Sequence, residues 1–523
     1  MWMRHSTQGG LSAVGLASVA LTLLVGCRVG PKYVAPNAPA PPAFKESSPA
    51  VYATAPQGTW RPADPQDAAL KGKWWEMFHE PELNDLEDQL DINNQNIAES
   101  FQNFMAARDL VREARASYYP TLTTDPSYSR QHTPGTLHNA GISTGTGTGT
   151  GTTGTVSSSG STSTVLSLPF DVSWEPDLWG KIRNTVREYQ NAAQVSAADL
   201  ENERLTEQAD LAEYYFELRG QDALQDLYNK TIEADRKALD LTKALYETGI
   251  DNDEAVAQAE VTLQNAEEAG TGIATNRAIY EHAIATLIGK PAPSFSLPVK
   301  PLTTAVPEIP VGVPSELLQR RPDIAAAERT MSEANALIGV EKAAYYPNVS
   351  LTGGGGLESS TISSLFSVPA LFWSVGASAS ETIFDAGLRR ATVAQYTAQY
   401  NADNAAYRQT VLTAFQQVED YVSTLRVTSA QTIQQEQSVN SAQRYLTIAT
   451  SRYETGLDPY LNVISAQTNL LTNQQTQVTL HVNEMTAAVE LVQALGGGWN
   501  VNQLPSAEKI TSNTAAKQVS TTP

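Results

Sequence analysis

The chain has 523 residues, of which 41% are hydrophobic and 17% charged, with a formal net charge of −21 and one cysteine. So acidic a protein has no electrostatic basis for binding nucleic acid, and one cysteine excludes an internal disulfide framework. Length alone suggests about three compact domains, yet proline is absent from 177–290 and from 370–458. Such stretches predict helices too long for compact domains.

The first element in chain order is an apolar, uncharged run over 11–26 that ends at Cys27. Such a run is either a membrane anchor or a signal, and a small residue followed by Cys favours a cleaved signal peptide of residues 1–26. A lone cysteine is ordinarily a buried apolar side chain, but this position predicts that Cys27 carries lipid as the first residue of a bacterial lipoprotein. Because Arg28 is not the Asp that retains lipoproteins in the inner membrane, we expect the outer membrane.

Four segments have the length and composition of β-strands: about Thr121–Arg130, Val165–Glu175, Asn348–Leu357 and Trp373–Ile383. Each is close to the 9–11 residues that a tilted membrane strand needs. Four strands cannot close a barrel, and an open sheet edge in lipid leaves backbone groups unpaired, so several subunits must contribute to one barrel. Pro169 predicts a bend or bulge, and the Gly/Thr/Ser tract 141–164 predicts a mobile loop.

Long helices dominate the rest of the chain. Lys181–Tyr246 reads as one helix of 66 residues, a rod of about 100 Å at 1.5 Å per residue. Its apolar residues are sparse and small, which is typical of a narrow coiled-coil seam. Such helices must pack on one another, within the chain and with other subunits.

The segment Leu245–Glu260 (L-Y-E-T-G-I-D-N-D-E-A-V-A-Q-A-E) returns 207 residues later as Arg452–Gln467 (R-Y-E-T-G-L-D-P-Y-L-N-V-I-S-A-Q). In each copy Y-E-T-G ends a helical pattern and a second pattern follows, which predicts two helical hairpins. The residues expected at these turns are Gly249 and Gly456 as left-handed closures, Asp251 and Asp458 as N-caps, and Pro459 in a first turn.

The repeat extends upstream with a changed spacing. Ala-Ser-Tyr-Tyr-Pro at 116–120 matches Ala-Ala-Tyr-Tyr-Pro at 343–347 with an offset of 227, which exceeds 207 by 20 residues. The Gly/Thr/Ser tract supplies such an insertion in the first copy. The chain is therefore predicted to be an internal duplication.

Several motifs carry a family resemblance. They are C-R-V-G-P-K-Y-V-A-P from Cys27, W-W-E-M-F at Trp74–Phe78 followed by P-E-L, L-L-Q-R-R-P-D-I at Leu317–Ile324, and the two Y-E-T-G turns. The chain resembles the outer-membrane efflux lipoproteins, TolC-like channels of the OprM and NodT type, over roughly residues 27 to 498. The resemblance implies a mainly α-helical chain with a membrane β-barrel part, built from duplicated strand–helix repeats. Three such chains would form a twelve-stranded barrel continuous with a twelve-helix periplasmic tunnel.

The expected organisation follows from the repeat and the resemblance. It comprises the signal peptide 1–26, a lipid-anchored and equatorial segment 27–82, repeat 1 over 83–290, a Pro-rich linker 291–314, repeat 2 over 315–498, and a tail 499–523. The tail is rich in Ser, Thr, Lys and Gln, a composition that predicts disorder.

In the resembled family the hairpin turns converge at the periplasmic end, where Tyr, Arg and acidic side chains hold neighbouring hairpins together. The corresponding gate candidates are Arg452, Tyr453, Asp458, Tyr246, Asp251 and Asp253. N-capping is a competing role for Asp251 and Asp458, compatible with the first. Some relatives carry two aspartates where this chain has Asn462 and Ser465, so an acidic ring would have to come from Asp458 and the first-copy acids.

The tip residues match the motif that relatives offer to a periplasmic adaptor protein. They are Thr248, Gly249 and Ile250 in the first copy, and Thr455, Gly456 and Leu457 in the second.

Motifs for other chemistry are absent. The six histidines belong to no H-x-x-x-H or Cys/His set, the chain contains no P-loop, and the G-T-G-T-G-T tract is low-complexity sequence that would be misread as a phosphate-binding loop. We therefore expect no metal site, no cofactor and no enzymatic activity.

These observations predict an outer-membrane exit duct of a tripartite efflux or export system. It would act as a homotrimer in outer-membrane lipid, conducting substrates passively from a periplasmic adaptor (membrane fusion) protein and an inner-membrane transporter. The alternatives are a non-channel coiled-coil scaffold lipoprotein and, far behind, an envelope hydrolase. Because a tunnel selects weakly, drugs, metals, lipids and peptides are all compatible cargo.

Overall fold

The computed structural model describes residues 28–37, 40–48, 51, 72–134 and 161–512, which divide into two compact units. The strand unit takes its described residues from 1–32, 112–188 and 335–397, and the helical unit from 33–111, 189–334 and 398–523. The expected signal peptide, Cys27 and residues 141–160 of the Gly/Thr tract lie outside the described residues. No helix in the described ranges is both long and apolar enough to cross a membrane.

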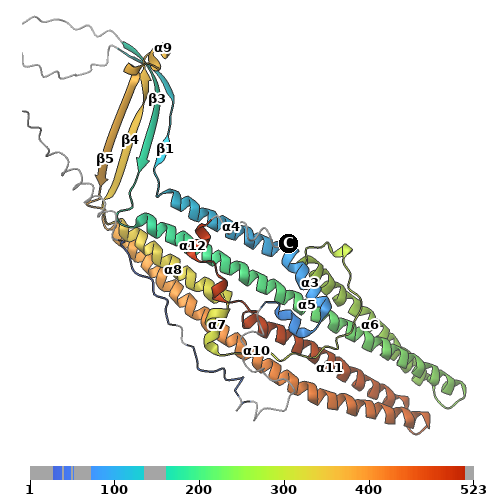
Figure 1. Ribbon diagram of the computed structural model, residues 1–523. Helices are drawn as coiled ribbons and strands as arrows, with labels where there is room; N and C mark the ends of the chain where they lie inside the picture. Colours follow the sequence, from blue (N-terminus) through green and yellow to red (C-terminus); the bar gives the residue numbers. More distant parts are fainter. Residues whose placement is uncertain (1–27, 38–39, 49–50, 52–71, 135–160, 513–523) are drawn as a thin grey trace, which may run out of the picture. The chain divides into compact units, whose positions relative to one another are not determined.

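Two long helical hairpins contain the longest helices of the chain (Figure 1). Helix α5 (Lys181–Glu247, 67 residues) precedes α6 (Asp253–Leu287, 35 residues), and α10 (Leu388–Glu454, 67 residues) precedes α11 (Tyr460–Ala494, 35 residues). Every bound of the second hairpin lies 207 residues after its counterpart in the first. The prediction of one uninterrupted helix over Lys181–Tyr246 is confirmed.

Shorter elements connect the hairpins and strands. They are η1 (Trp74–Phe78), α3 (Pro81–Asn93), α4 (Gln95–Ala116), η2 (Ala292–Ser294), α7 (Pro314–Arg320), α8 (Pro322–Ala343), α9 (Ile362–Leu365), η3 (Val368–Ala370), η4 (Val501–Gln503) and α12 (Ala507–Thr511).

The main core lies in the helical unit, where residues 74–90 pack against α5, α10 and α11. Trp74, Phe78 and Phe216 are among its largest fully buried side chains. Helices α5 and α11 approach closely at Gly220, where an added Cβ would lie 2.4 Å from a methyl of Val482. Small residues on these helices therefore allow close packing along a narrow seam.

A buried ion network fastens the Pro-rich linker to the first hairpin. Arg219 on α5 donates to Asp222 at 2.9 Å and to the Pro298 carbonyl at 2.7 Å. Arg277 on α6 donates to Asp222 at 2.7 Å and to the Leu297 carbonyl at 2.8 Å. Removing one member of such a buried pair typically costs about 3–5 kcal/mol, so the network fixes the linker on α5 and α6.

Both hairpin turns close through glycine, as predicted. Gly249 has φ +75° and Gly456 has φ +73°, the left-handed conformation that only glycine adopts at little cost. A Cβ added at either position would have no neighbouring atom within 4 Å, so backbone conformation rather than space selects glycine.

The predicted N-caps are wrong. Asn252, not Asp251, caps α6, with its side-chain oxygen accepting from the Ala255 N–H at 2.9 Å. Pro459 occupies the N-cap position of α11 in an extended conformation, rather than the first turn. Asp251 and Asp458 lie one residue further upstream, and their carboxylates accept hydrogen bonds from side chains outside the cap.

The strand unit contains one antiparallel sheet (Figure 1). Its strands are β1 (Thr121–Thr123), β2 (Ser127–Thr133), β3 (Ser161–Trp174), β4 (Asn348–Ser359) and β5 (Leu371–Ser380). Both β1 and β2 pair with one edge of β3, β3 pairs with β4, and β4 pairs with β5. Within the described part of the chain, the outer edges of β1/β2 and of β5 have no strand partner.

The predicted strands exist, with shifted bounds. Thr121–Arg130 is interrupted at 124–126, and the strand predicted over Trp373–Ile383 ends at Ser380. The strand predicted from Val165 begins at Ser161, so the last four residues of the expected loop 141–164 pair with β2. Pairing with each other extends β2 to Thr133 and starts β3 at Ser161, beyond the predicted ends at Arg130 and Val165.

Sequence analysis predicted a bend or bulge at Pro169, and the strand register shows no bulge there. The β3–β4 register continues unbroken through the pair Pro169↔Gly356. Because proline has no N–H, the ladder is interrupted on the other side of β3, at residues 124–126, where the Thr124 hydroxyl donates to the Pro169 carbonyl at 2.7 Å. Gly356 accommodates the proline, since a Cβ there would lie 2.3 Å from the Leu168 carbonyl oxygen.

The first described residues lie in an N-terminal slot of the strand unit. The Val29 N–H donates to the Trp179 carbonyl at 3.0 Å, and the Val29 carbonyl accepts from the fully buried Asn184 side chain at 2.9 Å. Gly30 has φ +126°, and a Cβ there would lie 2.7 Å from the Gly339 Cα. The slot is therefore built by residues of both sequence copies.

The tail prediction is wrong for residues 499–512, which form η4 and α12. Trp499 and Ile510 are buried, and the buried Arg108 side chain donates to the Ile510 carbonyl at 3.4 Å. Two apolar anchors are enough to order a segment whose composition is otherwise polar. Residues 513–523 lie outside the described ranges.

Gly356 gives a test of the sheet. Gly356→Ala should destabilise the protein by about 1–3 kcal/mol, because the new methyl would overpack against β3. Gly353→Ala is the matched control, since its added Cβ would meet only the Ser374 carbonyl oxygen, at 4.0 Å. Thermal unfolding followed by circular dichroism should show a lowered midpoint for the first variant, and equal midpoints for the two variants would contradict this packing.

Candidate functional site

The hairpin tips of the helical unit bring together two of the predicted gate residues from different copies. The Tyr453 hydroxyl donates to the Asp251 carboxylate at 2.6 Å and lies 3.2 Å from the Thr242 hydroxyl. Tyr453 is only 6% exposed, and burial, together with the hydrogen bond to Asp251, raises its pKa to about 12. The phenol therefore stays protonated and links the second hairpin to the first.

Arg452 and Asp458 form a second contact, within the turn of the second hairpin. The guanidinium donates two hydrogen bonds to the carboxylate, at 2.6 and 3.0 Å. These bonds hold the pKa of Asp458 below its ordinary value. Such a bidentate pair fixes the turn geometry, and half of the Arg452 side chain stays exposed.

Tyr246 and Asp253 are not brought into these contacts. Tyr246 is 46% exposed, and Asp253 lies in the exposed first turn of α6. At the 207-residue offset they correspond to Tyr453 and Tyr460, both of which are buried. The two tips thus share a backbone but differ in their side-chain contacts.

The tip residues present matching surfaces in the two copies. Thr248 and Thr455 each return their hydroxyl to carbonyls of the preceding helical turn. The following glycine turns the chain, and Ile250 and Leu457 are 67% and 69% exposed. Each tip therefore offers one apolar side chain to the solvent.

Sequence analysis missed two buried polar residues of α5 beside this site. Thr242 is fully buried next to Tyr453. Asp235 is 4% exposed, and burial raises its pKa from 3.8 to about 6. The only available signal was a polar residue at a seam position, which many coiled-coil helices also contain.

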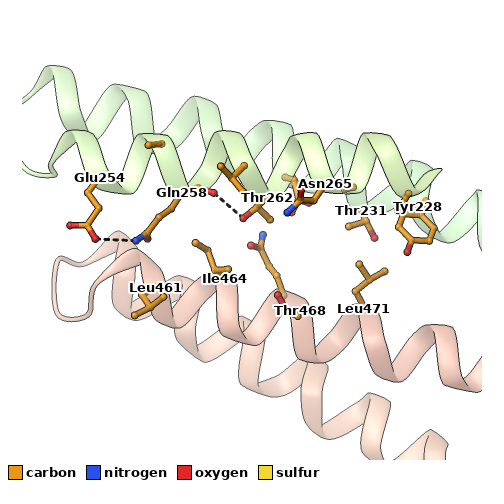
Figure 2. A pocket seen from close by; sticks show the side chains of 16 residues that line it. Tyr228, Thr231, Glu254, Gln258, Thr262, Asn265, Leu461, Ile464, Thr468 and Leu471 are labelled. Carbon is orange, nitrogen blue, oxygen red and sulfur yellow. Dashed lines mark hydrogen bonds between the residues drawn. The ribbon is translucent and has the colours of Figure 1, made fainter. Parts of the chain in front are cut away.

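An apolar groove runs between α6 and α11 from their first turns (Figure 2). Its volume is about 680 Å³, with Val261 on α6 and Leu461, Ile464 and Leu471 on α11 among its lining residues. Ile464 points into the space between α11 and α6, Leu471 faces Thr231 and Tyr228 of α5, and Gln258 and Glu254 are hydrogen-bonded to each other on the α6 wall.

The sheet has two chemically distinct faces. Directly paired residues share a face, so Leu122, Val172, Gly353 and Val375 form one row across all four strand positions. Leu122 is 68% and Val375 81% exposed. The apolar face carries Leu122, Tyr128, Leu166, Leu168, Phe170, Val172, Trp174, Val349, Leu351, Leu357, Leu371, Trp373 and Val375, and its polar members are Arg130, His132, Thr162, Thr164 and Ser359.

The opposite face carries small and polar side chains. It comprises Thr121, Thr123, Ser127, Ser129, Ser167, Asp171, Ser173, Ser350, Thr352, Ser374, Ser378 and Ser380, with Val165 and Phe372 as exceptions. An exposed apolar face opposite a polar one is the pattern of a membrane barrel strand.

Comparison with known proteins places this geometry in a family. The model of the outer membrane efflux protein family matches residues 86–290 and 313–497. The chain belongs to the outer membrane efflux protein family. It is 30% identical to the antibiotic efflux pump outer membrane protein ArpC of Pseudomonas putida, over 92% of this chain and 96% of that protein. It is 31% identical to the solvent efflux pump outer membrane protein SrpC of Pseudomonas putida, over 93% and 99% of the two chains.

Solved structures agree with the family assignment. The outer-membrane channel OprN aligns with a TM-score of 0.80 and 26% identity, over 90% of this chain and all of the other. The Campylobacter jejuni CmeC outer membrane channel aligns with a TM-score of 0.81 over 95% and 98% of the two chains, and at 21% identity it supports the fold alone.

These findings confirm the predicted family, its location in the outer membrane and its role as an efflux exit duct. The scaffold alternative is set aside, because the family and its structures are channels. The predicted helix-rich, TolC-like fold is likewise confirmed.

Asp235 makes the stability of the tips depend on pH. Its folded-state pKa exceeds its unfolded value, so the folded protein binds more protons between about pH 4 and 6, and stability falls as pH rises through that window and then levels off. Asp235→Asn should therefore be more stable than the wild type above pH 6, by at most about 3 kcal/mol.

Thermal midpoints at pH 4, 5 and 7 would measure this difference, with the exposed Asp240→Asn on the same helix as the control. A wild-type-to-variant difference that stays constant with pH would show that Asp235 carries no such linkage.

Proposed function

We propose that the duct is a homotrimer, with a twelve-stranded barrel continuous with a twelve-helix periplasmic tunnel. The observation that carries this proposal is the open sheet with an exposed apolar face and two unpartnered edges within the described residues. In lipid, each unpaired backbone group costs several kcal/mol. Three copies of four strand positions give twelve, above the eight of the smallest single-chain barrels.

The polar face of the sheet would line the lumen, and its apolar face would contact lipid. Ser and Thr predominate on the polar face, with Asp171 among them, so the lumen would be wet and mildly acidic. A bore of this kind conducts passively and needs no catalytic group. We accordingly propose a protein without enzymatic activity, cofactor or resident metal.

The anchoring of the N-terminus supports lipidation at Cys27. The next residues, Arg28 and Val29, bind Asn184 and Trp179 at the start of α5. Trp179 follows the end of β3 by only five residues in the chain. A lipid on Cys27 would thus be held next to the end of the sheet, where the bilayer surface is expected.

The hairpin tips would form the periplasmic gate. Tyr453 and Asp251 join the two hairpins of one subunit, and Arg452 with Asp458 stiffens the turn. Tyr246 and Asp253 have exposed side chains, which leaves them available to the neighbouring subunit. Opening would separate the hairpins and break the bond between Tyr453 and Asp251.

The exposed tips would dock a periplasmic adaptor that couples the duct to an inner-membrane transporter. The docking residues are Thr248, Gly249, Ile250, Thr455, Gly456 and Leu457, of which Ile250 and Leu457 supply the exposed apolar surface. The names of relatives specify antibiotic, toluene and solvent efflux. Small apolar compounds are therefore the first cargo to test.

The sheet faces can be tested with one substitution on each side of β5. Val375→Arg should destabilise the trimer by about 2–4 kcal/mol, since Arg would face the lipid near mid-membrane. Ser374→Arg, one residue away and on the polar face, should preserve the trimer and lower its cation conductance. Trimer yield after detergent extraction measures the first effect; equal tolerance of both changes would argue against a membrane barrel.

The gate can be tested by removing one hydroxyl. Tyr453→Phe keeps the ring but loses the hydrogen bond to a carboxylate, worth about 1.5–3 kcal/mol. The open fraction should rise about tenfold or more, measured as the open probability in single-channel recordings in planar bilayers. Tyr445→Phe, on the exposed side of α10, is the control. An open probability that is unchanged in both variants would remove Tyr453 from the gate.

A further inference from the structure

The two β-hairpins of the strand unit pair in the same register. The first is β1/β2 with β3, and the second is β4 with β5. In the first hairpin Tyr128 pairs with Leu166. The copy-two counterpart of Tyr128, 227 residues later, is Gly355, and that of Leu166, 207 residues later, is Trp373. Gly355 and Trp373 are also an observed pair. The same shift converts every pair of the first hairpin that falls within β4 and β5. The copies are therefore equivalent in strand register as well as in sequence.

The β3–β4 ladder is the junction between the two copies. It pairs the second strand of copy one with the first strand of copy two. The equivalent junction at the other end would pair β5, the second strand of copy two, with β1/β2, the first strand of copy one. These are the two edges that lack partners in the described sheet.

One chain cannot form this second junction by itself. β5 and β2 are separated by β3 and β4, a distance of about 14 Å at 4.8 Å per strand spacing. The occupant of each edge must therefore be the opposite edge of another copy of the chain.

We propose that β5 of one subunit pairs with β2 of the next in the register of the β3–β4 junction. In the observed junction Phe170 pairs with Gly355. Phe170 corresponds to Ala377, 207 residues later, and Gly355 corresponds to Tyr128, 227 residues earlier. The equivalent junction therefore places Ala377 opposite Tyr128 of the neighbouring subunit. This inference rests on the proposed trimer, to which it adds the atomic register of the subunit interface.

The chemistry of the two edges agrees with this register. Ala377 and Tyr128 both lie on the apolar face, so the faces of adjacent subunits join without a break. A slip by one residue would move Leu371, Trp373 and Val375 of β5 to the face that carries Ser127 and Ser129 of β2. In the observed junction Phe170 lies opposite Gly355, and in the inferred one Tyr128 lies opposite a comparably small residue.

Slips by two residues preserve the faces and are the real competitors. One would bring Tyr128 opposite Val375, and the other would bring it opposite Ala379. Both abandon the equivalence of the two junctions. Tyr128 is 64% and Val375 81% exposed in the single chain, so these side chains are accessible for a partner in any register.

Cysteine pairs distinguish the three registers. The double variant Tyr128→Cys with Ala377→Cys tests the inferred register, and Tyr128→Cys with Val375→Cys or with Ala379→Cys tests the slips. Directly opposite Cβ atoms lie about 5 Å apart and diagonal ones about 7–8 Å. Each protein is oxidised mildly, or treated with a thiol cross-linker of about 5 Å reach, and run on a non-reducing gel. The single-cysteine variants control for reaction through Cys27 and for folding.

We expect a several-fold excess of covalent trimer from the Tyr128/Ala377 pair over either slipped pair. Predominant cross-linking by a slipped pair would overturn the register while leaving the trimeric duct intact. If no pair cross-links and the purified protein is trimeric by light scattering, the edge pairing is overturned. If no pair cross-links and the protein is monomeric, the proposed trimer itself fails.

Discussion

The unpartnered backbone groups along β1/β2 and β5 set the constraint on which the other features depend. Inside the sheet every strand has two neighbours, and even Pro169 is accommodated, by a gap in one partner and a glycine in the other. At its outer edges the described sheet has none. Water could satisfy these groups but lipid cannot, and the exposed row from Leu122 to Val375 is suited to lipid. In the proposed trimer, membrane insertion and subunit association would therefore be coupled, since edge pairing between subunits satisfies the backbone groups that lipid cannot.

The two helical hairpins share a backbone but differ in their side-chain contacts. Helices α5 and α10 have the same length, as do α6 and α11, and both turns use glycine in the same conformation. The side chains at the tips have nevertheless diverged: Arg452 corresponds to Leu245, and the buried Tyr460 to the exposed Asp253. Only one hairpin supplies the tyrosine that reaches across. In the proposed trimer, six hairpins with similar backbones would therefore make two alternating kinds of tip contact.

Sequence patterns predicted features set by local rules and missed those decided by tertiary partners. The absence of proline indicated the long helices, and glycine placement indicated both turns. The N-cap assignment of Asp251 failed because a buried tyrosine from the other copy binds its carboxylate, leaving Asn252 as the cap. Pro169 was expected to distort its own strand, but Gly356 and the interrupted partner strand absorb it. Residues 499–512 are ordered by two buried apolar side chains, Trp499 and Ile510, whose effect the polar composition of the tail concealed.

The N-terminal slot has a consequence for the order of events during export. Gly30 packs on Gly339, which lies in α8 of the second copy, so the binding site for the first residues is incomplete while only the first half of the chain has been secreted. Throughout that interval Gly30 lacks its packing partner Gly339. Packing of Gly30 against Gly339 is then a late step, which requires both halves of the chain.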